Sequence, residues 1–148
     1  MPSLSKPQVV LISDISAVDA VILLRAIGTY TPTVRAVMEV KDGTEAVQYL
    51  SGTGKYSDRE EFPWPELLIM DMRMPRTTGI KVLRWLSAND VPNLKVAVLA
   101  DSAFVHFRKE AFTVGLQRNF RKAASLAELV EMLREDETPE GPVENKVE

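Results

Sequence analysis

The chain has 148 residues, of which 45% are hydrophobic and 26% are charged, and its formal net charge is −3. These values are typical of one globular domain, and they exclude a collagen-like or wholly disordered chain. The lack of cysteine excludes disulfides and zinc–thiolate sites, and a single histidine, His106, excludes a metal cluster built on histidines. The longest apolar runs are far shorter than the ~20 residues that span a bilayer, so we expect a cytoplasmic protein without a membrane partner.

Acidic residues gather at the C-terminal end of the sequence. Residues 135–148 contain six of the 21 acidic residues and one lysine, so the rest of the chain carries a net charge of +2. This balance does not suggest a nucleic-acid partner, because nucleic-acid-binding domains usually carry a strong basic stripe. We expect an N-terminal extension over residues 1–7, one domain over residues 8–135, and an acidic, disordered tail over residues 136–148.

Short apolar runs alternate with segments of helical periodicity along the domain. Strands are expected at residues 8–12, 33–40, 67–70, 95–99 and 118–121. Helices are expected from a Ser16 cap to Gly28, at residues 44–50, 79–87 and 103–114 with a stop at Gly115, and along Leu126, Leu129, Val130 and Leu133. The first helix is expected to bury Val18, Val21, Ile22 and Ile27. Residues 51–65 are expected to form a long polar loop.

The alternation of strands and helices predicts an α/β fold with a five-stranded, parallel, doubly wound sheet. The strands read as unbroken apolar runs, which is typical of strands that helices cover on both faces. A sheet of this kind binds its ligand outside the carboxyl ends of its strands. The residues that follow the strands are therefore the candidates for function.

Several polar side chains are expected at that edge of the sheet. The first strand ends in Ser13 and Asp14, the third in Asp71, the fourth in Ala100 and Asp101, and Lys122 follows the fifth. Two carboxylates make an oxygen site suited to Mg²⁺, and a lysine can hold a phosphoryl oxygen. A carboxylate can also attack phosphorus and become an acyl phosphate. This edge therefore predicts a site for phosphoryl transfer.

The segment from Asp71 to Gly79, DMRMPRTTG, resembles the phosphoacceptor loop of response-regulator receiver domains, D-x-x-M-P-x-x-x-G. The resemblance covers residues 8–134 and includes the segment Asp42-Gly43-x-Glu45-Ala46. The loop around residues 55–59 is similar to that of a single-domain subgroup related to cyanobacterial phytochrome response regulators. The resemblance implies the flavodoxin-like (βα)5 fold with strand order 2-1-3-4-5.

The resemblance also implies roles for individual residues. Asp71 matches the phosphoacceptor, and Asp14 matches a direct ligand of Mg²⁺. Arg73 matches the position whose backbone carbonyl is a further metal ligand, so the identity of its side chain need not matter for that role. Lys122 matches the lysine that contacts the acceptor carboxylate and then the phosphoryl group.

The resemblance further implies the partners and the mode of action. A sensor histidine kinase, with the phytochrome type as first candidate, would supply the phosphoryl group. The signal would pass by protein–protein contact, and a homodimer through the face of the fourth and fifth helices is expected. The chain would not be an enzyme beyond weak self-phosphorylation from small donors and self-dephosphorylation.

Several positions depart from the family pattern. Ser13 replaces an acid that contacts a metal-bound water, which should weaken Mg²⁺ binding. Ala100 replaces a hydroxyl that binds the phosphoryl group, and such a bond to a charged group is worth roughly 1.5–3 kcal/mol. Asp101 would repel the phosphoryl group if its side chain pointed inward. Asn119 replaces the switch aromatic, and strand alternation places the neighbouring Phe120 on the opposite face.

These departures leave an alternative function open. A pseudo-receiver would keep the fold and act as an interaction module without phosphorylation, and Ala100, Asp101 and Asn119 favour it. A flavodoxin-like cofactor binder is disfavoured, because Asp14 stands where a phosphate-cradling loop would be needed. A hydrolase is disfavoured because no Ser/His/Asp set can be assembled around His106.

Overall fold

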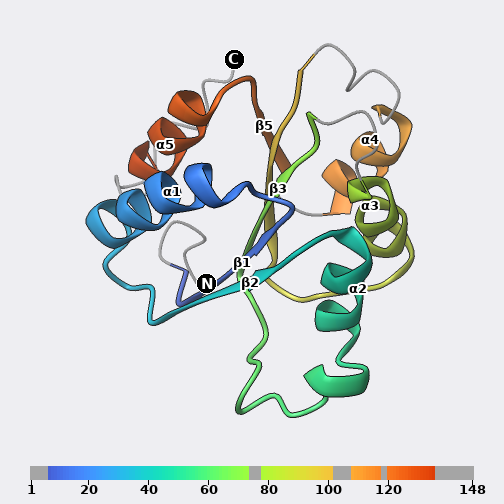
Figure 1. The fold of residues 1–148 in the computed structure, drawn as a ribbon. Coiled ribbons are helices and arrows are strands. Elements are labelled where there is room, and N and C mark those ends of the chain that lie inside the picture. The colour runs from blue at the N-terminus through green and yellow to red at the C-terminus, as the bar shows by residue number, and fades with distance from the viewer. Residues whose placement is uncertain (1–6, 74–77, 102–107, 118–119, 136–148) are drawn as a thin grey trace.

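The computed structural model describes residues 7–73, 78–101, 108–117 and 120–135. These residues form a five-stranded parallel sheet in the order β2-β1-β3-β4-β5, with helices on both faces (Figure 1). The strands are β1 (Val9–Ser13), β2 (Ala36–Val40), β3 (Leu67–Asp71), β4 (Lys95–Leu99) and β5 (Phe120–Ala123). The flavodoxin-like (βα)5 fold and its strand order are confirmed.

The helices divide between the two faces of the sheet. They are α1 (Ala17–Tyr30), α2 (Gly43–Ser51), α3 (Gly79–Ala88), α4 (Arg108–Gln117) and α5 (Leu126–Glu135), with a short 3-10 helix η1 (Gly54–Tyr56) after α2. In Figure 1, α1 and α5 cover one face, and α2, α3 and α4 cover the other. Every residue of β1, β3 and β4 is buried. The unbroken apolar runs in these strands thus reflect a sheet that is covered on both sides.

Two hydrophobic clusters hold these layers together. Side chains alternate along each strand, so Leu11, Leu68 and Val96 join the cluster under α2, α3 and α4. Val10 and Ile69 join the cluster under α1 and α5. Neighbouring helices are also linked at the surface, through bonds such as Lys81 Nζ to Thr44 Oγ1 and Arg84 Nε to Glu110 Oε2.

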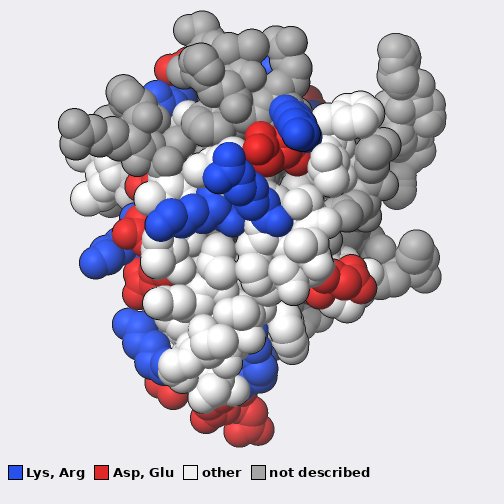
Figure 2. All heavy atoms as spheres, turned by 90° about the vertical axis from the view of Figure 1, so that its right-hand side faces the viewer, with Lys and Arg blue, Asp and Glu red and all other residues white. Residues whose placement is uncertain are grey.

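Figure 2 looks onto the face over α2, α3 and α4, where a small group of basic side chains lies beside acidic ones and next to neutral surface. The pair of Arg84 and Glu110 is 3.5 Å long, and Arg84 is largely exposed. An exposed pair of this kind contributes ~0–1 kcal/mol. The buried clusters therefore hold this layer in place, and the surface pairs add little.

Of the four apolar positions expected on the buried face of the first helix, Ile27 is buried and the other three are not. Val18, Val21 and Ile22 are exposed, whereas α1 buries Ala20, Leu23, Ala26 and Ile27. The sequence from Val21 to Leu24 is apolar on more than one side of the helix, so its periodicity did not fix the buried face. The exposed apolar side chains form a surface on α1 that the core does not use.

Several expected boundaries also need correction. Helix α1 runs past Gly28 to Tyr30, and α4 runs past Gly115 to Gln117. Neither glycine has the positive φ that is typical of a glycine at a helix end. Among the described glycines, φ is positive at Gly52, which caps the end of α2, and at Gly54. Strand β5 spans Phe120–Ala123 rather than 118–121. The expected N-terminal extension and acidic tail lie almost wholly outside the described residues, so those boundaries stay predictions.

None of the helices in the described part of the chain is long and apolar enough to cross a membrane.

Candidate functional site

Asp14 directly follows β1 and Asp71 ends the neighbouring strand β3, both at the carboxyl edge of the sheet. Ser13 of β1 pairs with Met70 of β3, and each acid is the next residue along its strand direction. Asp71 is the last residue of β3 and is 5% exposed, while Asp14 is half-buried. The backbone of Asp14 turns into the left-handed region, with φ +66°, which aspartate tolerates better than most residues. Strand register thus brings together two acids that are distant in sequence.

The loop after β3 begins with tightly packed residues. Met72 is fully buried, and its backbone N–H donates to the Leu99 carbonyl at 2.7 Å. A Cβ atom on Gly79 would lie 2.9 Å from Cγ of Met72. Glycine at position 79 therefore makes room for the Met72 side chain.

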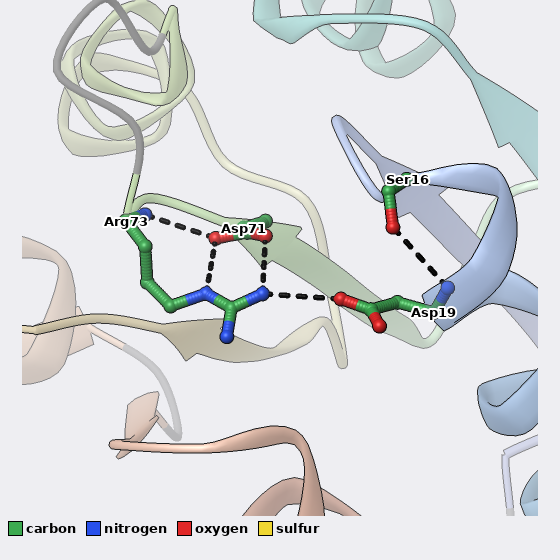
Figure 3. Close-up of polar contacts among 4 residues, drawn as sticks. All are labelled: Ser16, Asp19, Asp71 and Arg73. Atoms are coloured by element: carbon green, nitrogen blue, oxygen red, sulfur yellow. Dashed lines mark hydrogen bonds and ion pairs between the residues drawn. The ribbon is translucent and has the colours of Figure 1, made fainter.

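The side chain of Arg73 binds Asp71 directly (Figure 3). Its Nε donates to Asp71 Oδ1 at 3.0 Å, and its Nη2 donates to Asp71 Oδ2 at 2.8 Å. The backbone N–H of Arg73 donates to Oδ1 as well, at 2.9 Å. This two-pronged contact is the geometry in which a guanidinium binds a carboxylate most strongly. The hydrogen bond to Asp71, helped by the charge of that carboxylate, raises the pKa of Arg73 above its usual value.

A second acid from α1 joins this cluster. Nη2 of Arg73 also donates to Asp19 Oδ2 at 3.2 Å. Asp19 lies in the first turn of α1, where its backbone N–H donates to Oγ of the N-cap residue Ser16 at 3.2 Å. Sequence reasoning missed both Asp19 and the Arg73 side chain, because 54 residues separate them and only the backbone of Arg73 had an expected role.

The donor atoms at this edge fit a small divalent cation. Carboxylates and backbone carbonyls are the kinds of oxygen that Mg²⁺ accepts together with water, and the edge carries the carboxylates of Asp14 and Asp71. Within the described residues, no group of three or more His, Cys, Asp or Glu side chains gathers as a metal site. Ser13 is buried, and its Oγ has no hydrogen-bond partner among the described residues. A hydroxyl at this position supplies no negative charge to the edge, unlike the acid that it replaces.

The remaining expected site residues have mixed outcomes. Lys122 is part of β5, in register with Val98, rather than a residue after the strand, and its side chain is exposed. Ala100 is buried, and its N–H donates to the Ala123 carbonyl at 2.9 Å. Asp101 is exposed, so the inward orientation that would repel a phosphoryl group is not the one seen. Asn119 lies outside the described residues.

Phe120, the neighbour of Asn119, packs against one of the two hydrophobic clusters. Phe120 is partly buried against the cluster under α2, α3 and α4. It lies beneath α4, where a Cβ atom on Gly115 would be 3.9 Å from its own Cβ. Whether Asn119 lies on the opposite face stays a prediction, because Asn119 is outside the described residues.

Comparisons with known proteins identify the family of this fold. The family model of the response regulator receiver domain matches residues 9–134. The chain belongs to the response regulator receiver family. This receiver resembles the structure of response regulator RPA3017 in red light signalling of R. palustris, with 30% identity, a TM-score of 0.65, and coverage of 86% of this chain and 89% of that one.

Two further comparisons involve one protein, the response regulator Rcp1. Rcp1 of Synechocystis sp. (strain ATCC 27184 / PCC 6803 / Kazusa) is 29% identical over 97 residues, which are 65% of this receiver and 63% of Rcp1. The match thus spans less than two thirds of that protein. The structure of the Mn²⁺-bound form of Rcp1 has a TM-score of 0.62 and 25% identity, and covers 87% of this chain and 91% of that one. The receiver is thus similar to RPA3017 and to Rcp1 in sequence and in fold.

Proposed function

We propose that this receiver is a single-domain response regulator that accepts a phosphoryl group on Asp71 from a sensor histidine kinase. The observation that carries the proposal is the position of Asp71, buried at the end of β3 and one strand away from Asp14. A carboxylate oxygen of Asp71 would form the new P–O bond as the P–N bond of a phosphohistidine breaks. The product is an acyl phosphate, which changes the charge at the edge of the sheet.

Mg²⁺ is the proposed cofactor, and it would neutralise the charge of the phosphoryl group during transfer. Asp14, Asp71 and the carbonyl of Arg73 are its proposed ligands. Lys122 is proposed to contact the phosphoryl oxygens as a point charge. Ser13 supplies no carboxylate for a metal-bound water, so binding of Mg²⁺ is expected to be weak.

The phosphoryl transfer can be tested by intact mass after incubation with Mg²⁺ and acetyl phosphate. The parent chain is expected to gain one phosphoryl group, and Asp71→Asn is expected to gain none, because an amide is not a nucleophile towards phosphorus. Chelation of the metal should remove the gain from the parent. A parent chain that takes up no phosphoryl group at high donor and Mg²⁺ concentrations would contradict the proposal.

That negative result would favour the pseudo-receiver instead. Ala100 supplies no hydroxyl at the end of β4, and the Asp71 carboxylate is already bound by Arg73. Both features suit an interaction module that keeps the receiver fold without the chemistry. Equal phosphoryl gain in the parent and in Asp71→Asn would instead place the acceptor on another residue.

The exposed apolar surface of α1 is the proposed docking site for the kinase. Val18, Val21 and Ile22 are 71%, 60% and 48% exposed, and they flank Asp19, which is linked to Asp71 through Arg73. Phosphoryl transfer requires the donor histidine to reach Asp71, so an apolar surface beside that residue suits a helical partner. The similarity to a regulator of red light signalling supports a kinase of the phytochrome type.

A charge in this surface should impair transfer from the kinase but not from a small donor. Ile22→Glu is expected to slow transfer from a phosphorylated phytochrome-type kinase at least about 10-fold, since buried apolar anchors dominate interface energies. Thr29→Glu adds the same charge near the other end of α1 and is the matched control. Rates with acetyl phosphate should stay unchanged in both variants. Equal kinase rates for the parent and Ile22→Glu would exclude this surface.

The output is proposed to be protein–protein contact, including a homodimer through α4 and α5. Phe112 of α4 is 67% exposed, so it could be covered in such a pair. Light scattering of the full chain measures the molar mass in solution, and a monomer at every concentration would contradict the homodimer. No role for nucleic acid is proposed, and a cytoplasmic location stays a prediction.

A further inference from the structure

The guanidinium of Arg73 lies between two carboxylates from different elements. Asp71, at the end of β3, accepts hydrogen bonds from Nε and Nη2 of Arg73. Asp19, in the first turn of α1, accepts a hydrogen bond from the same Nη2. Figure 3 shows the guanidinium pointing to both acids. The side chain of Arg73 is 30% exposed, and that of Asp19 is 25% exposed. The three side chains thus form one partly buried cluster at the proposed acceptor.

Arg73 and a divalent cation would compete for Asp71. An ionised carboxylate has about four lone-pair positions. Arg73 uses three of them, since Oδ1 accepts from the backbone N–H and from Nε, and Oδ2 accepts from Nη2. A cation on Oδ1 would have to displace one of the two bonds there, and a cation on either oxygen would lie beside the guanidinium and be repelled by its charge.

Asp19 gives Arg73 a second partner within reach. Because Nη2 already contacts both acids, the guanidinium can leave Asp71 while it keeps its bond to Asp19. Asp19 is itself held at the start of α1, where its N–H is bonded to Ser16. The charge of Arg73 would then remain paired when a cation occupies Asp71.

We propose that Arg73 and Asp19 form a positioning pair that sets the affinity of the acceptor site for a divalent cation. Arg73 competes with the cation for Asp71, and Asp19 retains Arg73 once the cation has displaced it. The inference rests on the proposed function, because it concerns the metal site of the same acceptor. It goes beyond that function by giving the Arg73 side chain and Asp19 opposite effects on metal binding.

Calorimetric titration of the full chain with Mg²⁺ tests the two residues singly and together. Arg73→Gln is expected to tighten Mg²⁺ binding about 3- to 10-fold, since it removes a partly exposed positive charge from beside the cation. Arg73→Lys keeps the charge but cannot form the two-pronged contact, so its affinity should lie between those of the parent and Arg73→Gln. Asp19→Asn is expected to weaken binding about 3-fold.

The double variant separates the proposed role of Asp19 from a direct effect of its charge. If Asp19 acts through Arg73, then Asp19→Asn has no effect in the Arg73→Gln background. Arg84→Gln removes the same charge from the surface of α3 and is the matched control, with unchanged affinity expected. Circular dichroism of each variant establishes that it is folded.

The outcomes distinguish this inference from the proposed function. Unchanged or weaker Mg²⁺ binding in Arg73→Gln overturns the competition, even if the parent chain is phosphorylated on Asp71. An equal loss from Asp19→Asn in both backgrounds overturns the role of Asp19 as the partner of Arg73. If no variant binds Mg²⁺ and the parent takes up no phosphoryl group, the inference and the proposed function are both contradicted.

Discussion

Alanine at Gly43 is expected to destabilise the protein by about 2–3 kcal/mol, because this position has no room for a methyl group. A Cβ atom there would lie 2.1 Å from the Thr78 carbonyl oxygen and 2.6 Å from the Thr78 carbonyl carbon. Both are backbone atoms, so relief requires the start of α2 to move away from the start of α3. The hydrogen bond from the Gly43 N–H to Thr78 Oγ1, 2.6 Å long, would be lost with that movement.

Helix propensity favours Gly43→Ala and so opposes the steric clash. The control is therefore a Gly→Ala substitution in a helix position that has room for the methyl group. Gly43 begins α2, and alanine would ordinarily favour a helix by up to ~1 kcal/mol over glycine. A Cβ atom on Gly28 of α1 would have nothing within 4 Å, so Gly28→Ala receives the propensity gain without a clash. Urea denaturation measures both variants. If Gly43→Ala proves as stable as Gly28→Ala, the close approach of α2 to Thr78 is wrong.

The motif Asp42-Gly43-x-Glu45-Ala46 is explained by the way α2 begins. The N-cap residue Asp42 accepts a hydrogen bond from the Glu45 N–H at 2.9 Å, and Glu45 accepts one from the N–H of Lys41, the residue before the cap, at 2.8 Å. Ala46 is fully buried. Gly43 meets Thr78, which is the N-cap residue of α3. The motif therefore stabilises the fold at the start of α2. Its contacts are with Lys41 and Thr78 and not with Asp71.

The fold could be predicted from the sequence because its strongest signals are physical requirements of a parallel sheet. Strands such as β3 and β4 are buried on both faces, so they must be continuously apolar. Helix α5 buries Leu129 and Leu133 as its spacing predicted. The buried face of α1 could not be predicted, because Val21 and Ile22 are apolar yet exposed.

The acids of the candidate site could be predicted from topology alone. Parallel strands end at one edge, so Asp14 and Asp71 were expected together before any contact was known. The Arg73 contacts could not be predicted in this way. They depend on the direction of one flexible side chain, and on an acid 54 residues away that reads only as a favourable first-turn residue of α1.

The loop over residues 51–65 contains more structure than its polar sequence suggested. Tyr56 is 4% exposed, and its ring centroid lies 5.0 Å from that of Tyr49 and 4.9 Å from that of Phe62. Its hydroxyl donates to Glu45 Oε2 at 2.7 Å, which ties the loop to α2. Trp64 remains half exposed and stacks under Arg59, 4.0 Å from the ring centroid to Cζ.

Alanine at Tyr56 is therefore expected to cost about 3–5 kcal/mol of folding free energy, as for other buried aromatic side chains. Tyr56→Phe keeps the ring and loses only the hydroxyl, so it should cost about 1.5–3 kcal/mol, the range for a hydrogen bond to a charged group. Urea denaturation of both variants measures the difference. Equal losses would mean that the aromatic packing of the loop contributes nothing, and that the bond to Glu45 is the whole effect.

The cost of Tyr56→Phe should also depend on pH, with a sign that follows from Glu45. The N–H of Lys41, and then the hydroxyl of Tyr56, lower the pKa of Glu45 below its usual value of 4.5. A carboxyl group with a lowered pKa stabilises the folded state fully above its unfolded pKa, and this contribution is lost as the pH falls through the folded pKa. The difference between the parent and Tyr56→Phe should therefore be constant at neutral pH and shrink in acid below pH 4.5. A difference that stayed constant into acid would show that the tyrosine hydroxyl does not depend on an ionised Glu45.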